Sequence, residues 1–188
     1  NRTNVRLEER AMDPLHTCCF TGHRPEKLPW GEREDHPDCV ALKQNMAEQL
    51  ERLYQGGFRR FVCGMARGAD FYFAQEVLAL RQVHGDVTLE AALPCLGQAT
   101  RWGEADRLRW HRLVGACDVT TLVQEHYDRY CMLRRDRYMV DQSSAILAVF
   151  NGTRGGTQYT LNYAMERRLD IYLFDLNHPA APPTHLSP

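Results

Sequence analysis

Short apolar runs alternate along this chain with longer segments in which apolar residues recur at helical spacing. The pattern predicts strands near residues 15–20, 59–63, 86–92, 118–123, 145–150 and 170–174. It predicts helices over about residues 38–55, 69–82, 103–115, 130–142 and 156–168. Regular alternation of strand and helix is typical of a parallel sheet with helices on both faces. We therefore expect an α/β fold with a mainly parallel sheet.

The same alternation suggests how the chain is divided. Residues 15–176 show no internal repeat and no shift in composition, which predicts a single domain. Residues 1–14 are charged and aperiodic, and we interpret them as an irregular leader or a cloning remnant. Residues 177–188 are rich in proline, so we expect a tail that does not pair with the sheet.

Charge and cysteine content narrow the class of protein. The chain has 23 basic and 24 acidic residues, which argues against a large, non-specific surface for duplex DNA. Its seven cysteines form no C-x-x-C pair, so we expect neither a disulfide framework nor a metal site. Free cysteines within apolar runs suit the reducing cytoplasm, and no run reaches the ~20 apolar residues of a membrane span. For Cys63 and Cys95, redox sensing and burial as inert thiols both remain open.

Two glycine-rich turns each join a predicted strand to a predicted helix. The first is Cys63-Gly64-Met65-Ala66-Arg67-Gly68-Ala69-Asp70, and the second spans residues 151–157. The first turn of a helix presents unpaired N–H groups and the positive end of the helix dipole, which favour a phosphate or a carboxylate. We expect the glycines of both turns to let a ligand approach the backbone. They are Gly64, Gly68, Gly152, Gly155 and Gly156, and Thr157 adds a hydroxyl. Two such turns predict the two ends of one nucleotide-like ligand.

Polar residues also follow the other strands, at the sheet edge where α/β proteins bind ligands. Thr21-Gly22-His23-Arg24-Pro25 comes after the first strand and is either an anion contact or a surface turn. Arg67 and Asp70 flank a helix start, where Asp70 either bonds a ribose hydroxyl or only favours the helix dipole. Gln98 and Trp102 follow the third strand and either bind and stack a base or anchor their loop. Neither a Ser/His/Asp order nor a Walker-type lysine occurs, so we expect phosphate binding without phosphoryl transfer and no required cofactor.

These motifs in combination resemble the SLOG superfamily, which joins the DNA-processing protein DprA/Smf and the lonely-guy phosphoribohydrolases. Within it, the chain is most similar to the uncharacterised YpsA-like family, over about residues 15–175. The resemblance rests on residues 21–25 and 64–70, Pro94 with Gln98 and Trp102, Arg137-Tyr-Met-Val-Asp141, and Gly155-Gly156-Thr157. It implies a Rossmann-like three-layer sandwich, a pocket for a nucleotide or an ADP-ribose-like ligand, and assembly as a homodimer.

The chain departs from the lonely-guy pattern at one position. Those enzymes use an arginine and a glutamate to cleave an N-glycosidic bond, and Arg137 suits the role of the arginine. Thr160 stands where the resemblance places the glutamate, and a hydroxyl cannot replace that carboxylate. Hydrolysis would then need Asp141 or Glu166 to supply the carboxylate.

The sequence thus favours a cytoplasmic protein that binds a nucleotide or nucleotide sugar as a sensor or sequestering module. Two alternatives stay open. One is an N-glycosidic hydrolase of nucleoside monophosphates, with Arg137 on the phosphate. The other is DprA-like binding of single-stranded DNA by the arginines of residues 101–112 and 129–137.

Overall fold

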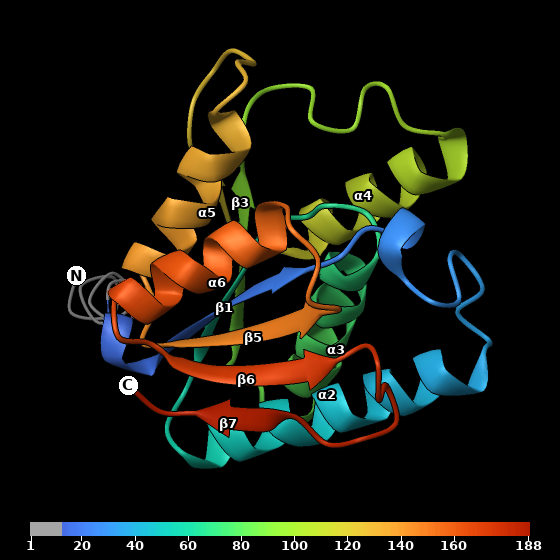
Figure 1. The fold of residues 1–188 in the computed structure, drawn as a ribbon. Helices are drawn as coiled ribbons and strands as arrows, with labels where there is room; N and C mark the ends of the chain where they lie inside the picture. The colour runs from blue at the N-terminus through green and yellow to red at the C-terminus, as the bar shows by residue number, and fades with distance from the viewer. Residues whose placement is uncertain (1–12) are drawn as a thin grey trace.

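The computed structural model describes residues 13–188, which form a Rossmann-like three-layer sandwich around one seven-stranded sheet (Figure 1). The strand order is β4-β3-β2-β1-β5-β6-β7. Strands β1 to β6 are parallel, and β7 is antiparallel to β6. The expected leader lies outside the described residues, apart from Asp13 and Pro14.

The six predicted strands are present, with ends within two residues of the predicted ones. They are β1 (Thr17–Gly22), β2 (Arg60–Cys63), β3 (Thr88–Leu93), β4 (Val119–Leu122), β5 (Ala145–Phe150) and β6 (Asp170–Asp175). The central strands β1, β2 and β5 are buried along almost their whole length. Burial on both faces explains why these strands are continuous apolar runs in the sequence.

Five α-helices cover the two faces of the sheet (Figure 1). On one face lie α2 (Pro37–Gln55), α3 (Ala69–His84) and α4 (Glu104–Ala116), which share a core with Phe20 and Phe61. On the other lie α5 (Cys131–Asp141) and α6 (Gly156–Glu166), which share a core with Ile146 and Ile171. Short 3₁₀ helices, η1 (Pro14–His16) and η2 (Pro25–Lys27), flank β1.

The winding of the chain reverses between β1 and β5, which are hydrogen-bonded neighbours in the sheet. From β1 the chain passes through α2, α3 and α4 towards β4 on one face. It then returns through α5 to β5 and continues through α6 to β6 on the other face. Helices therefore diverge above the C-terminal ends of β1 and β5, which leaves a crevice at this topological switch point.

The tail pairs with the sheet, so the expectation of an unpaired tail is wrong. Residues Thr184–Leu186 form β7, in register with β6 from Leu173 to Ile171. The ring of His185 stacks on Tyr172 with 4.5 Å between centroids, and its Nε2 lies 2.8 Å from Asp170 Oδ1. The tail prolines, Pro179, Pro182, Pro183 and Pro188, lie outside Thr184–Leu186, so they do not prevent the short antiparallel pairing. None of the helices within residues 13–188 has the length and apolar character needed to cross a bilayer.

Candidate functional site

A cavity of about 290 Å³ opens at the switch point. Its lining comes from the end of β1, the following residues His23–Lys27, the start of α3, one face of α5 and the start of α6. The predicted residues brought together here are Thr21, Gly22, His23, Arg24, Asp70, Gly156 and Thr157. Segments distant in the sequence thus converge at the sheet edge that the sequence indicated.

Three of the predicted glycines make room for the protein's own atoms. A Cβ atom on Gly22 would lie 2.8 Å from Ala69 Cβ, and one on Gly68 would lie 2.8 Å from the carbonyl oxygen of His23. Gly68 also has a φ of +84°, which disfavours any other residue. A Cβ atom on Gly64 would lie 2.6 Å from Arg135 Cζ. These glycines allow the end of β1 to approach α3 and leave space for a buried arginine.

That arginine, Arg135, lines the cavity and is only 5% exposed. Its guanidinium donates to the carbonyl oxygen of Gly64 and, from Nε, to Asp136 Oδ1 at 2.7 Å. Burial opposes the charge, but the carboxylates of Asp136 and Asp70 outweigh it, so the pKa of Arg135 is raised. The Thr160 hydroxyl lies 3.1 Å from Asp136 Oδ2 and 2.9 Å from the carbonyl oxygen of Gly156, so its single hydrogen is shared between the two acceptors. Thr160 thereby links the Asp136 carboxylate to the first turn of α6.

The sequence contained a signal for this charged face of α5. Met132, Arg135, Asp136 and Met139 all line the cavity and have the spacing i, i+3, i+4, i+7 of one helix face. A charged pair between two methionines on such a face indicates a buried polar contact. The DNA-binding hypothesis instead treats the arginines of residues 129–137 as contacts for a single strand.

Asp70 lines the cavity from the first turn of α3 and is 5% exposed. Its Oδ2 accepts the Ala66 N–H at 3.0 Å. Burial raises the pKa of this carboxyl to about 6, although the charge of Arg135 acts in the opposite direction. Burial of a charged carboxylate costs free energy, and a residue that is kept in spite of this cost is typical of a functional site.

The raised pKa predicts a pH-dependent effect of Asp70→Asn on stability. The folded state binds the Asp70 proton more tightly than the unfolded state, so the carboxyl destabilises the fold increasingly from about pH 4 to 6. We expect Asp70→Asn to raise the free energy of unfolding by about 1–3 kcal/mol at pH 7.5, and to have almost no effect at pH 4. Urea denaturation at both pH values measures this, with Asp35→Asn at an exposed position as control. An equal gain at both pH values would contradict the assignment.

His23 connects the end of β1 to the turn before α6. Its Nε2 lies 2.7 Å from Asn151 Oδ1, and its Nδ1 lies 3.3 Å from the Thr157 hydroxyl. The shorter contact places the proton on Nε2, so that Nδ1 accepts from Thr157. Burial lowers the pKa of His23, and nearby Lys27 lowers it further. The imidazole is therefore neutral at pH 7 and fixes the wall of the cavity.

Lys27 and Arg24 supply positive charge at the mouth of the cavity, and Lys27 was not among the predicted site residues. The Lys27 ammonium donates to the Thr153 hydroxyl at 3.2 Å and to the Arg154 carbonyl oxygen at 3.0 Å. It would lie 3.2 Å from a Cβ atom on Gly155, directly before α6. Lys27 thus brings a positive charge to the N-terminus of α6, where the helix dipole has the same sign.

The start of α6 is open on the side of this cavity. A Cβ atom on Gly156 would contact nothing within 4 Å, and Gly155 caps the helix without a side-chain hydrogen bond. Gly155 and Gly152 have positive φ values of 152° and 86°, which turn the chain between β5 and α6, and neither lines the cavity. The unpaired N–H groups of the first turn of α6 are thus available to a ligand.

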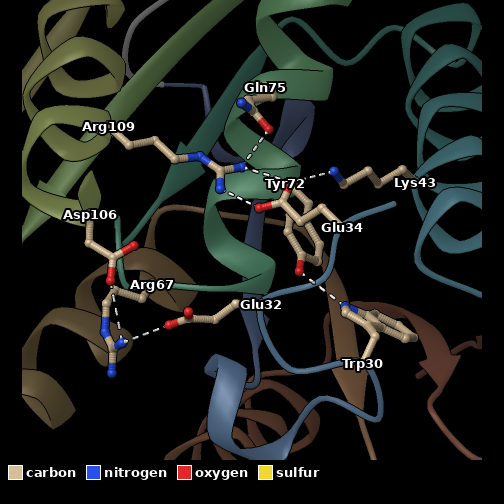
Figure 2. A network of polar contacts seen from close by, with 9 residues as sticks. All are labelled: Trp30, Glu32, Glu34, Lys43, Arg67, Tyr72, Gln75, Asp106 and Arg109. Atoms are coloured by element: carbon tan, nitrogen blue, oxygen red, sulfur yellow. Dashed lines mark hydrogen bonds and ion pairs between the residues drawn. The ribbon is translucent and has the colours of Figure 1, made fainter. Parts of the chain in front are cut away.

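Arg67, predicted as a ligand contact, does not line the cavity and forms ion pairs with neighbouring carboxylates (Figure 2). Its guanidinium donates to Glu26 and to Asp106, the latter at 3.4 Å, and lies 3.9 Å from Glu32. These contacts fix the segment that carries Lys27 to the turn before α3 and to α4.

A second cluster holds the same segment further along (Figure 2). Arg109 of α4 donates to Glu34 and to Gln75, and Lys43 of α2 donates to Glu34 at 2.5 Å. Close by, the Trp30 indole donates to the Tyr72 hydroxyl at 3.1 Å. Residues 24–36 are thereby fixed to three helices, which positions Arg24 and Lys27 before any ligand binds.

Gln98 and Trp102 lie beside a second cavity, of about 390 Å³. The Gln98 amide donates to the carbonyl oxygens of Gly64 and Met65 at 2.9 and 3.2 Å, and accepts from the Trp110 indole at 3.2 Å. Gln98 thus anchors its loop, one of the two roles considered for it. Trp102 packs edge-on against Phe71 and also lines the cavity.

The three residues considered for hydrolysis lie on the exposed surfaces of α5 and α6, outside the cavity. Arg137 donates to the Tyr159 hydroxyl at 2.5 Å. Asp141 accepts from the Tyr163 hydroxyl at 2.9 Å and pairs with Arg167, directly after α6. Glu166 is the last residue of α6. The charged groups that reach the cavity from α5 are Arg135 and Asp136 instead.

Comparison with known families and proteins agrees with this architecture. The YpsA family model, described as the YspA SLOG family, matches residues 18–176. The chain belongs to this SLOG family. A UPF0398 protein of Halalkalibacterium halodurans is 26% identical over 157 residues, which cover 82% of both chains. The SPbeta prophage-derived protein YoqJ of Bacillus subtilis is 29% identical over 158 residues, which cover 77% of this chain and 91% of YoqJ. The predicted SLOG membership is confirmed.

Solved structures confirm the Rossmann-like fold expected for a SLOG protein. DNA processing protein A from Helicobacter pylori, in a structure that describes its single-stranded DNA binding mode, aligns with a TM-score of 0.57 and 14% identity. That alignment covers 88% of this chain and 67% of the other. DprA from Streptococcus pneumoniae aligns with a TM-score of 0.55 and 16% identity, and this chain spans half of it.

Proposed function

We propose that this SLOG protein binds a nucleotide or a nucleotide-derived, ADP-ribose-like molecule in the cavity at the switch point. The proposal is carried by the convergence of Lys27, Arg24 and the open start of α6 on one cavity. A phosphate there would accept hydrogen bonds from the first N–H groups of α6 and contact the Lys27 ammonium. These groups are fixed by the contacts of residues 24–36, so little ordering would be needed on binding.

The remainder of the cavity suits the sugar of a nucleotide. Asp70 offers a carboxylate acceptor for ribose hydroxyls, as the sequence suggested. The volume of about 290 Å³ is near the lower end of the range for small-molecule sites, which matches a mononucleotide-sized group. The Asp136 carboxylate is already hydrogen-bonded to Arg135 and Thr160. This supports a sensor or sequestering protein that binds its ligand, and it argues against hydrolysis of the ligand.

Calorimetric titration with AMP, ADP and ADP-ribose tests the proposal. We expect saturable binding of at least one of these compounds, with one site per chain. Chromatography of the same mixtures would detect released base, and its release would make the protein an N-glycosidic hydrolase. Absence of binding by all three compounds would contradict the proposed function.

Lys27→Met is expected to weaken nucleotide binding roughly tenfold, because it removes one charge-assisted contact to phosphate. Arg52→Met provides a control, since Arg52 is an exposed cation of α2 that does not line the cavity. Calorimetry should show a weakened Lys27→Met variant and a nearly unchanged Arg52→Met variant. Equal losses in both would contradict the assignment of Lys27 to the phosphate.

Single-stranded DNA is the second candidate ligand, favoured by the structural similarity to DprA. A strand could place one phosphate at α6 and others along the exposed arginines of α4. The net charge of −1 gives this reading less support than a small nucleotide. Fluorescence anisotropy with a labelled oligonucleotide, at low and at 200 mM salt, tests it. Binding that weakens steeply with salt would support DNA, and a flat response at low salt would exclude it.

A further inference from the structure

The second cavity adjoins the proposed nucleotide site. It lies between the loop after β3, residues 94–103, and the loop after β4, residues 123–130. The Leu96 N–H donates to the Glu125 carbonyl oxygen at 3.1 Å and joins the two loops. Arg24 and Met132 line both cavities. A ligand that fills the first cavity can therefore extend into the second past the Arg24 guanidinium.

The second cavity is lined by aromatic and aliphatic side chains that suit a flat ring. Trp102 is held by its edge-on contact with Phe71, with 6.2 Å between ring centroids. Tyr127 and Leu96 on the facing loops also line this cavity and are 74% and 64% exposed, so both side chains are accessible to a ligand. Two aromatic rings and a flanking aliphatic side chain can contact the flat face of any nucleobase. Such stacking does not depend on the hydrogen-bonding groups at the edge of the base.

The charges at the junction indicate what joins the two parts of the ligand. Arg24 makes no side-chain hydrogen bond or ion pair within residues 13–188, whereas Arg67 and Arg109 nearby are each paired with carboxylates. Arg101 adds a second cation at the rim of the second cavity. A free guanidinium between two cavities is suited to a bidentate contact with phosphate oxygens.

We propose that the ligand is a dinucleotide-class molecule. Its pyrophosphate contacts the guanidinium of Arg24, and its second planar base stacks on Trp102 and Tyr127. This inference rests on the proposed function, because it extends the ligand of the same site. One nucleotide half occupies the cavity at α6, and the other half occupies the cavity between the two loops.

Calorimetry with ADP and with diadenosine 5′,5″-diphosphate tests the inference. We expect the dinucleotide to bind at least about tenfold more tightly than ADP, because stacking a second base adds a contact that ADP lacks. Tyr127→Ala should remove about tenfold of the dinucleotide affinity and leave ADP binding unchanged. Tyr130→Ala is the matched control, an exposed tyrosine of the same loop that lines neither cavity.

The outcomes separate the two proposals. Equal affinities for both nucleotides, or equal effects of Tyr127→Ala and Tyr130→Ala on the dinucleotide, would overturn the two-part ligand while leaving nucleotide binding intact. Equal weakening of ADP and dinucleotide by Tyr127→Ala would overturn it as well. Failure of both compounds to bind the wild-type protein would overturn the proposed function and this extension together.

Discussion

Replacement of Arg135 by methionine is expected to lower the free energy of unfolding by about 3–5 kcal/mol at pH 7.5. The guanidinium lies between the buried carboxyl groups of Asp70 and Asp136, and it raises the stability of both charged forms. Without it, Asp136 keeps only the Thr160 hydroxyl, and the carbonyl oxygen of Gly64 loses a donor. Breaking a buried ion pair from one side leaves an uncompensated charge, which is why the loss is large.

Urea denaturation monitored by circular dichroism measures the effect. Arg137→Met is the matched control, because Arg137 is an exposed arginine of the same helix bonded to Tyr159. We expect that control to change stability by less than about 0.5 kcal/mol. The deficit of Arg135→Met should shrink at pH 4–5, where Asp70 takes up a proton. Similar losses for the two variants would show that Arg135 is not the central charge of the cavity.

Gly156→Asp is expected to weaken nucleotide binding by more than about 100-fold. The substitution places a carboxylate at the opening where the first N–H groups of α6 and Lys27 favour a phosphate. A Cβ atom at this position meets nothing within 4 Å, and aspartate in the first turn of a helix is favourable. The variant should therefore fold as well as the wild type and fail only in binding.

Gly103→Asp is the control for this substitution. Gly103 is the N-cap of α4, a Cβ atom there also meets nothing within 4 Å, and the residue lines neither cavity. Thermal unfolding should give similar midpoints for both variants, and calorimetry should show binding only for Gly103→Asp. Full affinity in Gly156→Asp would place the ligand elsewhere.

The fold was predictable because its determinants are local and periodic. Buried strands such as β5 are unbroken apolar runs, and the helix ends coincide with glycine and proline positions such as Pro37 and Gly85. The short strand β7 was not predictable, because the stacking of His185 on Tyr172 is a contact between distant segments. Local pattern carries no information on such pairing.

The candidate site was predictable only in part. The convergence of Thr21, Asp70 and Gly156 follows from parallel strands ending at one edge. The role of each glycine was not predictable from the sequence, because Gly64 accommodates a side chain 71 residues further along the chain. The direction of each arginine side chain was not predictable either. Arg135 faces the cavity and Arg137 faces away from it, because successive helix positions point 100° apart.

The most direct test of nucleotide binding at the switch point is a titration of ¹⁵N-labelled protein with ADP, followed by amide chemical shifts. We predict the largest shifts at Gly22, Gly156 and Thr157, because these residues line the cavity. Shifts confined to residues away from the ends of β1 and β5, or no shifts at millimolar ADP, would contradict the account.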